Sequence, residues 1–207
     1  MGRFLLVHGA WHGAWCFHDL VEELDARGHH AEAVDLPCEE VGLTQRDYAA
    51  VVGPRPGWIV VGHSLGAQTI PLVDAARRVY LAGVLPVAEP SPACFAPGFG
   101  GTARDEAGRS YWPDADTCAA RMYPDCTRDR SDWAFARLRP QAPIVFAPAS
   151  FGPDDVVIAT LRDQAIDPGW QVRTARAHGA ELIELDAGHS PFFTHPAELA
   201  DLLSSLA

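Results

Sequence analysis

The chain has 207 residues, of which 48% are hydrophobic and 21% are charged, as is typical of a soluble globular protein with one substantial core. Its formal net charge of −11 argues against nucleic acids and acidic membranes as partners. No apolar run reaches the length of a membrane span, and the first one, Phe4 to Val7, is too short for a signal peptide. We therefore expect a single domain over residues 1–207 and a cytoplasmic location.

The content of cysteine, lysine and asparagine further limits which kinds of functional site the chain can form. Five cysteines without any Cys-x-x-Cys spacing indicate reduced thiols, and neither a disulfide framework nor a zinc site. All 16 basic residues are arginines, which excludes Schiff-base chemistry and the P-loop, because both require lysine. Asparagine is also absent, which excludes a Cys-His-Asn triad. We expect no metal and no organic cofactor.

Apolar strands and helices alternate along the first part of the chain. A strand is predicted over residues 3–7, followed by a glycine-containing loop over residues 8–15. Apolar residues at helical spacing then predict a helix over residues 17–28. A second strand is predicted over residues 30–35, and it is followed by a short helix whose N-cap is Thr44.

The next stretch carries the pattern Gly-x-Ser-x-Gly, with Ser64 between Gly62 and Gly66. A strand is predicted over residues 58–61 and a helix over about residues 65–77, so Ser64 lies at a strand-to-helix turn. This is the pattern of a nucleophile elbow, in which the serine is strained and the glycines let strand and helix approach closely. An ordinary turn containing glycine and serine is the alternative interpretation.

The alternation stops after a further strand, which is predicted over residues 79–85. The following residues are rich in proline, and only two short helices are predicted there, one over residues 114–122 and one capped by Ser131. Such a stretch between strands of one sheet indicates an inserted cap or lid over about residues 87–152.

Alternation then resumes up to the end of the chain. It gives a strand over residues 155–160, a helix that begins at Asp167, a strand over residues 181–185 and a last helix that begins at Pro196. The sum is an α/β fold with a six-stranded, mostly parallel, doubly wound sheet. In such sheets the functional residues lie in loops at the carboxyl ends of the strands.

A serine nucleophile needs a base, and the base needs an acid that orients it. His189 follows the last predicted strand, which places it downstream of Ser64 and at the same edge of the sheet. Asp163 follows the preceding strand and is the predicted acid. Two alternatives stay open: Asp167, which a helix cap explains better, and Glu89, which follows another strand.

Acyl transfer also needs two N–H donors for the oxyanion that forms on the attacked carbonyl. The residue after the nucleophile, Leu65, is expected to supply one of them. The loop after the first strand is expected to supply the other, from Ala10 or, as a second choice, from Trp11. Gly9, Trp11 and, in the cap, Trp112 are expected to contact the substrate.

At these residues the chain resembles the α/β-hydrolase branch that contains the plant methylesterases and hydroxynitrile lyases. The resemblance is carried by the loop at 8–15, the Gly-His-Ser-Leu-Gly pattern at 62–66, Asp163 five residues before a proline, and His189 after a glycine. It covers the whole chain in order and is weak in the cap. It implies an α/β-hydrolase fold, an esterase-type triad with the two oxyanion donors named above, an active site beneath the cap, and a homodimer.

The sequence therefore predicts a serine hydrolase that cleaves a small, neutral, hydrophobic carboxylic ester through an acyl-enzyme. Thioesters and lactones would use the same groups. Two other functions stay open, a lyase or cyclase that uses the triad for proton transfer, and a non-catalytic protein that binds a small molecule. The lyases that the chain resembles carry a lysine after the catalytic histidine, where this chain has Ser190, and a threonine where it has Gly9. Cyanohydrin cleavage is therefore not expected.

Overall fold

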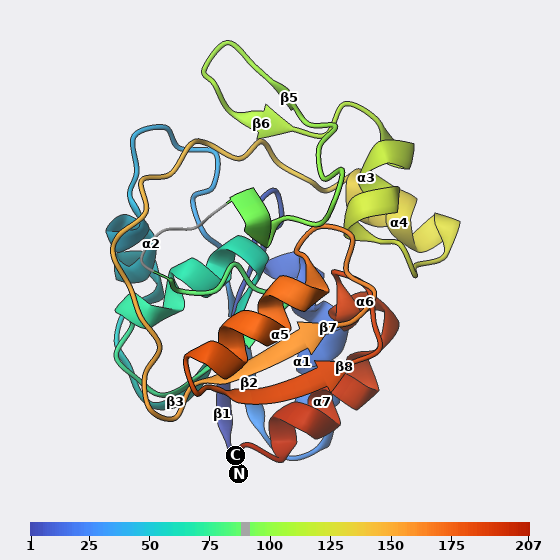
Figure 1. The fold of residues 1–207 in the computed structure, drawn as a ribbon. Helices are drawn as coiled ribbons and strands as arrows, with labels where there is room; N and C mark the ends of the chain where they lie inside the picture. The colour runs from blue at the N-terminus through green and yellow to red at the C-terminus, as the bar shows by residue number, and fades with distance from the viewer. Residues whose placement is uncertain (88–91) are drawn as a thin grey trace.

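A six-stranded sheet lies at the centre of the computed structural model, which describes residues 1–87 and 92–207 (Figure 1). Neighbouring strands of this sheet are parallel throughout, and their order is β2-β1-β3-β4-β7-β8. The strands are β1 (Arg3–Val7), β2 (His30–Val34), β3 (Arg55–His63), β4 (Ala75–Leu81), β7 (Val156–Thr160) and β8 (Glu181–Leu185). The predicted parallel sheet is confirmed.

Helices connect these strands. The helices outside the long β4–β7 connection are α1 (His18–Ala26), α2 (Gln45–Val52), α5 (Pro168–Ala177), α6 (Pro191–Thr194) and α7 (Pro196–Ser204), with 3-10 helices η1 (Ala14–Phe17), η2 (Ser64–Gln68) and η3 (Ile70–Leu72). Thr44 caps α2 and Asp167 caps α5, as predicted, because each side chain accepts a backbone N–H group of the first turn. Within the two described ranges, no helix is long and apolar enough to span a membrane.

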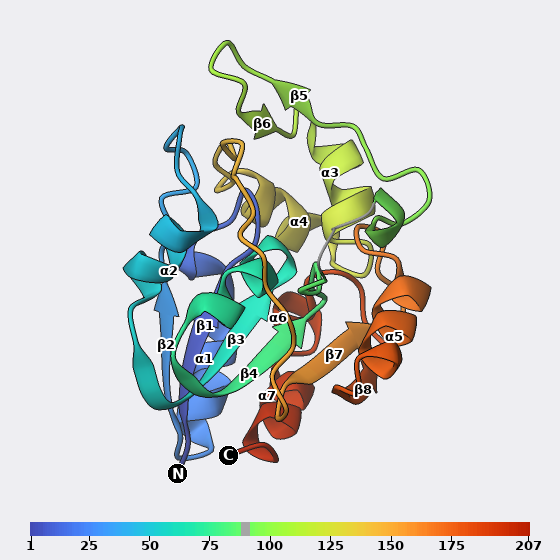
Figure 2. The same ribbon diagram turned by 60° about the vertical axis from the view of Figure 1, so that its left-hand side comes forward.

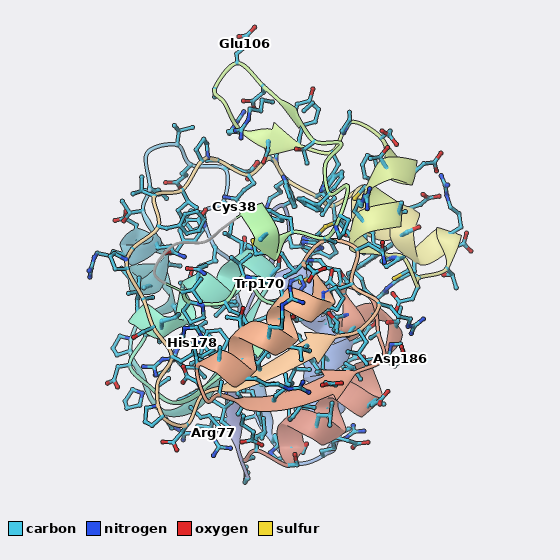
Figure 3. All side chains as sticks on the ribbon, viewed as in Figure 1. Cys38, Arg77, Glu106, Trp170, His178 and Asp186 are labelled. Atoms are coloured by element: carbon cyan, nitrogen blue, oxygen red, sulfur yellow. The ribbon has the colours of Figure 1, made fainter. Side chains whose placement is uncertain are left out.

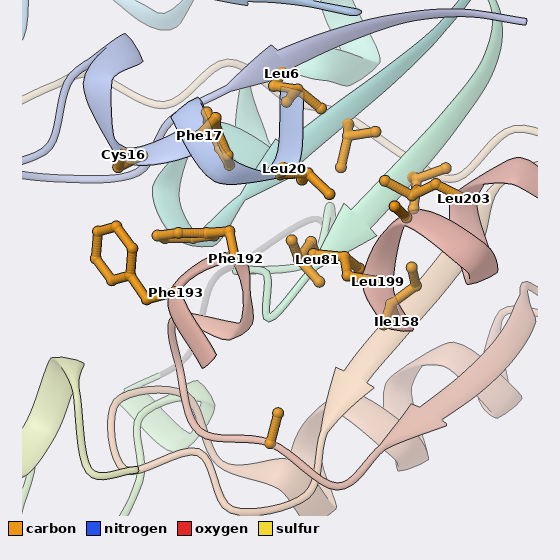
Figure 4. Close-up of a cluster of buried hydrophobic side chains, with 14 of the residues drawn as sticks. Leu6, Cys16, Phe17, Leu20, Leu81, Ile158, Phe192, Phe193, Leu199 and Leu203 are labelled. Atoms are coloured by element: carbon orange, nitrogen blue, oxygen red, sulfur yellow. The ribbon is translucent and has the colours of Figure 1, made fainter. Parts of the chain in front are cut away.

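Two apolar clusters pack on opposite faces of the sheet, because successive side chains of a strand point in opposite directions. In β1, Phe4 and Leu6 point into a cluster that α1, α6 and α7 cover (Figure 4). Leu5 and Val7 point into the other cluster, which is covered by α2, α5 and the 3-10 helices after β3. Helices on both faces define the doubly wound arrangement.

The β4–β7 connection contains η4 (Pro92–Cys94), β5 (Ala103–Arg104), β6 (Ser110–Tyr111), α3 (Ala115–Met122) and α4 (Arg128–Phe135). Figures 1 and 2 show these elements above the carboxyl ends of the central strands, whereas the last part of the connection runs down beside the sheet to the start of β7. The prediction of α3 is confirmed. The prediction that Ser131 caps the next helix is wrong: α4 begins earlier, with Thr127 as its N-cap, and the Ser131 hydroxyl donates to the carbonyl of Arg128 inside the helix.

The predicted helix over residues 65–77 is also wrong. Only the short helices η2 and η3 form there, and β4 already begins at Ala75 and ends at Leu81, four residues before the predicted end of that strand. Helix-forming alanines and arginines are drawn into the sheet because β4 pairs with β3 along its length. The guanidinium of Arg78 then donates to the carbonyls of Ile70 and Val73, which satisfies acceptors that a longer helix would have used.

Candidate active site

Ser64 lies at the sharp turn between β3 and η2. Its φ angle is 51°, in the left-handed region that side chains other than glycine rarely adopt. A Cβ atom at Gly62 would lie 2.8 Å from the carbonyl oxygen of Gly66, and one at Gly66 would lie 2.5 Å from the carbonyl oxygen of His8. Both positions therefore exclude a side chain, and this close approach of backbones holds the strained serine in place.

His189 is held next to Ser64 by the loop that follows β8. Its side chain is fully buried, and its Nε2 atom lies 3.1 Å from the Ser64 hydroxyl oxygen. Its Nδ1 atom lies 2.9 Å from a carboxylate oxygen of Asp163. A carboxylate only accepts, so Nδ1 carries the proton and Nε2 is left to accept the proton of the serine hydroxyl.

Asp163 is fixed by donors from its own loop. One carboxylate oxygen accepts the N–H groups of Ala165 and Ile166, at 2.7 and 2.9 Å. The other accepts the Thr160 hydroxyl at 3.0 Å as well as the ring of His189. Both oxygens thereby have hydrogen-bond donors, which a fully buried carboxylate requires.

Of the two other acids that the sequence left open, the structure describes Asp167 only. The carboxylate of Asp167 accepts the N–H group of Trp170 at the start of α5, as a helix cap does. Glu89 lies outside the described residues.

The two predicted oxyanion donors flank the serine. Ala10 and Leu65 line the same cavity as Ser64 and His189. Leu65 lies in the first turn of η2, where an N–H group has no partner within the helix. No hydrogen bond to the Ala10 N–H group is found within the described part of the chain. Gly9, predicted to contact the substrate, is not among the described residues that line the cavity. A Cβ atom at Gly9 would lie 2.7 Å from Cβ of Ser64, so the glycine lets the loop approach the serine closely.

Three buried histidines hold the loops around the site. His8 accepts the N–H group of Leu36 at 2.9 Å, and His12 accepts the hydroxyl of Tyr123 at 2.8 Å. Burial lowers the pKa of His8 to about 4 and that of His12 to about 3, so both rings stay neutral and keep these bonds at neutral pH. Burial likewise lowers the pKa of His63, whose Nε2–H donates to the carbonyl of His189 at 2.9 Å.

A cavity of about 510 Å³ opens from the serine toward the β4–β7 connection. Its lining is mainly apolar and includes Trp11, Phe95, Phe99, Ile144, Phe146 and Ile166. A cavity of this size accommodates a small organic molecule. The site thus brings Ser64, His189 and the backbone of Ala10 and Leu65 together in one mainly apolar cavity.

A model of the alpha/beta hydrolase family matches residues 4–202. The chain belongs to this family. The curated relatives include a probable esterase, PIR7A, from Oryza sativa subsp. indica, which is 34% identical over 106 residues, or 42% of this chain and 40% of the rice protein. That match therefore spans well under half of either protein. A carbendazim hydrolyzing esterase from Nocardioides sp. (strain SG-4G) is 26% identical over the full length of both chains.

Solved structures support the same fold. A methylesterase from Arabidopsis is 24% identical, covers 99% of this chain and 98% of its own, and superposes with a TM-score of 0.78. Polyneuridine aldehyde esterase is 20% identical, covers 100% of this chain and 99% of its own, and superposes with a TM-score of 0.79.

In this α/β hydrolase, Trp11 and Trp112 have different places. Trp11 lines the cavity, has a φ angle of 64°, and donates its indole N–H to the carbonyl of Ser110 at 3.0 Å. Trp112 is 5% exposed and packs behind it, against the rings of Trp11 and Phe99. Trp112 is not one of the described residues that line the cavity, so the predicted substrate contact is not found there.

Sequence reasoning missed the cavity residues that the β4–β7 connection supplies to this α/β hydrolase. They come from separate stretches of the connection, and only its general aromatic content signalled them. It also missed Asp125, whose carboxylate accepts the N–H group of Gly188 beside the base. These contacts join residues far apart in sequence, so no local pattern could predict them.

Proposed function

We propose that the protein is a serine-dependent carboxylic ester hydrolase. The observation that carries this proposal is the continuous pair of hydrogen bonds from Asp163 through His189 to Ser64, which ends at the cavity. A serine hydroxyl is a weak nucleophile until a base takes its proton, and the orienting carboxylate stabilises the imidazolium that forms. The names of relatives such as the rice and Nocardioides esterases support the same reaction type.

The reaction proceeds in two halves. The Ser64 oxygen attacks the ester carbonyl while Nε2 of His189 takes the hydroxyl proton, and the N–H groups of Ala10 and Leu65 bind the oxyanion. The tetrahedral intermediate collapses, His189 gives the proton to the leaving alcohol, and an acyl-enzyme remains. A water molecule activated by His189 then attacks the acyl carbon and releases the acid. No metal or organic cofactor takes part.

The substrate is a small ester with largely apolar groups. The apolar lining of the cavity supports this class, and so does the name methylesterase carried by an Arabidopsis relative, which is 47% identical over 45 residues. Thioesters and lactones would be attacked in the same way. Trp11 contacts the substrate from the loop after β1, whereas Gly9 acts through its close approach to the serine.

A lyase or cyclase is the second candidate, and one observation favours it. A relative that is named a synthase and not an esterase, norfluorocurarine synthase 1 from Strychnos nux-vomica, is 25% identical over 99% of this chain and 95% of its own. That name keeps a reaction other than ester hydrolysis open without specifying it. A cyanohydrin lyase is disfavoured, because the chain contains no lysine to stabilise a cyanide leaving group and has Ser190 after the base.

Three measurements test the proposal. Hydrolysis of p-nitrophenyl esters of increasing acyl length should be detected for the wild-type protein, and a serine-directed fluorophosphonate should label Ser64. Labelling without turnover of any ester would favour the lyase or cyclase. Absence of both would indicate a binding protein. Cyanide release from mandelonitrile that depends on Ser64 and His189 would contradict the ester hydrolase.

The proposal also covers the cap, the oligomeric state and the location of the protein in the cell. We propose a single domain with a cap over the site at about residues 87–152, of which residues 88–91 lie outside the described part of the chain. The resemblance to plant methylesterases leads us to expect a homodimer. The five cysteines are all free in the structure, in keeping with a reducing cytoplasm. Light scattering after gel filtration measures the oligomeric state.

A further inference from the structure

One wall of the cavity is polar. Arg104 in β5 pairs with Ser110 in β6, and Ser110 pairs in turn with Gln141, so the three residues stand in one row. All three line the cavity. Aromatic side chains such as Phe95 and Phe146 form the apolar part of the cavity lining. The cavity therefore has an apolar body and one polar wall above the serine.

Arg104 brings a permanent positive charge to that wall, because a guanidinium does not lose its proton in proteins. Among the lining residues that the structure describes, the other basic one is His189, which belongs to the catalytic relay, and none is an aspartate or glutamate. The lining of the cavity is thus biased toward a negative ligand, although the chain as a whole has a net charge of −11.

The charge of Arg104 is not neutralised by its neighbours. Its Nη1 atom donates to the carbonyl of Gly108 at 2.7 Å, and within residues 1–87 and 92–207 no carboxylate oxygen lies within 4.0 Å of its guanidinium. The adjacent Asp105 is occupied by the guanidinium and the N–H group of Arg109. Glu106 extends outward from the tip of the β5–β6 loop (Figure 3). The hydrogen bond to Gly108 therefore orients the Arg104 guanidinium, and its other N–H groups can bind a ligand.

On the basis of the ester hydrolysis proposed above, we infer that the substrates are monoesters of dicarboxylic acids. The ester group lies at Ser64, the free carboxylate binds Arg104, and an apolar chain between them lies in the body of the cavity. A guanidinium binds a carboxylate through two parallel N–H donors, which gives both affinity and orientation. A neutral ester of the same length forms no such pair.

A series of linear substrates tests this inference. The kcat/KM of monomethyl esters of dicarboxylic acids, from succinate to sebacate, is compared with that of methyl esters of the monocarboxylic acids with the same number of carbons. The ratio of the two values should exceed one and pass through a maximum at the chain length that spans the distance from Ser64 to Arg104. A ratio at or below one at every length would overturn the inference.

Variants assign the preference to the guanidinium. Arg104→Gln should lower the ratio roughly tenfold, because a charge-assisted pair at a partly solvated mouth is lost, and Arg104→Lys should retain part of it. Arg109→Gln is the matched control, since it removes the same charge from the same hairpin at a residue that pairs with Asp105 and does not line the cavity. An unchanged ratio in Arg104→Gln, or an equal fall in Arg109→Gln, would contradict a specific site.

A binding measurement separates this inference from the proposed reaction. Calorimetry with Ser64→Ala and with Ser64→Ala, Arg104→Gln compares the affinity for the monomethyl ester at the best chain length, or for monomethyl adipate if no ester is turned over. Weaker binding to the double variant supports the carboxylate site even where hydrolysis fails. Equal binding of both variants rejects the site, whatever the activity.

Discussion

The carboxylate of Asp125 accepts a hydrogen bond from the N–H group of Gly188, the residue directly before His189, at 2.7 Å. The same oxygen accepts the Thr194 hydroxyl at 3.3 Å and lies 3.7 Å from the guanidinium of Arg162. Asp125 follows α3 in the β4–β7 connection, so this nearly buried carboxylate links the connection to the loop that holds His189.

Replacement of Asp125 should therefore affect the position of His189. Asp125→Ala is expected to lower kcat for a p-nitrophenyl ester about tenfold with a smaller change in KM, because small displacements of a catalytic group are costly. Asp125→Asn keeps an acceptor for Gly188 and should restore most of the rate. Asp114→Ala is the control, since the Asp114 carboxylate accepts the N–H group of Thr117 within α3 and its loss costs about 1 kcal/mol of stability. Equal losses of kcat in the two alanine variants would show a merely structural role.

Ser64→Ala should remove nearly all ester turnover. Loss of the nucleophile lowers kcat by on the order of 10⁶ in a serine hydrolase. The substitution leaves Gly62 and Gly66 in place, so the elbow should still form and the circular dichroism spectrum should match that of the wild type. Turnover of more than a small fraction of the wild-type rate in the folded variant would place the nucleophile elsewhere.

Asp163→Asn should lower turnover by roughly 10⁴, because the base loses its orienting carboxylate. Asp167→Asn, four residues further along, should leave turnover nearly unchanged, since asparagine also caps helices well. Steady-state kinetics of both variants decide the assignment. The reverse order of effects would move the acid to Asp167, and a dominant effect of Glu89→Gln would move it to Glu89.

Phe146 and Trp112 should respond differently to alanine. Phe146 lines the cavity and is 43% exposed, so Phe146→Ala should change the relative kcat/KM among acyl lengths with little loss of stability. Trp112 is buried behind Trp11, so Trp112→Ala should lower the free energy of unfolding by about 3–5 kcal/mol. Urea unfolding and a p-nitrophenyl ester series measure both effects. A shift in acyl preference confined to Trp112→Ala would contradict this division.

Acid should destabilise the fold before the carboxylates titrate. The pKa of His8 is lowered to about 4 and that of His12 to about 3, against 6.5 in the unfolded chain. Between pH 6.5 and 4 the unfolded chain therefore binds protons that the folded chain does not. The free energy of unfolding thus decreases as the pH is lowered, by about 1.4 kcal/mol per pH unit for each histidine. Urea unfolding at about pH 7 and pH 5 should show this loss. Equal stability at both values would contradict buried, neutral rings.

The central elements and the hydrogen-bonded row of Ser64, His189 and Asp163 could be predicted from the sequence. The strands around Leu5 and Ile158 are short apolar runs, and the Gly-x-Ser-x-Gly pattern at Ser64 depends on backbone contacts that only glycine permits. Because all parallel strands end at one edge of the sheet, the order of Ser64, Asp163 and His189 along the chain already predicted that they would meet.

The tertiary structure alone decided the remaining features. Ala75 and its neighbours have good helix propensity, yet pairing with β3 makes them a strand, since a partner distant in sequence outweighs a weak local preference. From the sequence Trp112 is expected to contact the substrate, and only its packing against Trp11 shows that it lies behind the cavity wall. The places of Arg104 and Asp125 depend on how the irregular β4–β7 connection folds over the sheet. Such long-range packing leaves no periodic pattern in the sequence, because it follows from shape and hydrogen bonding between separate segments.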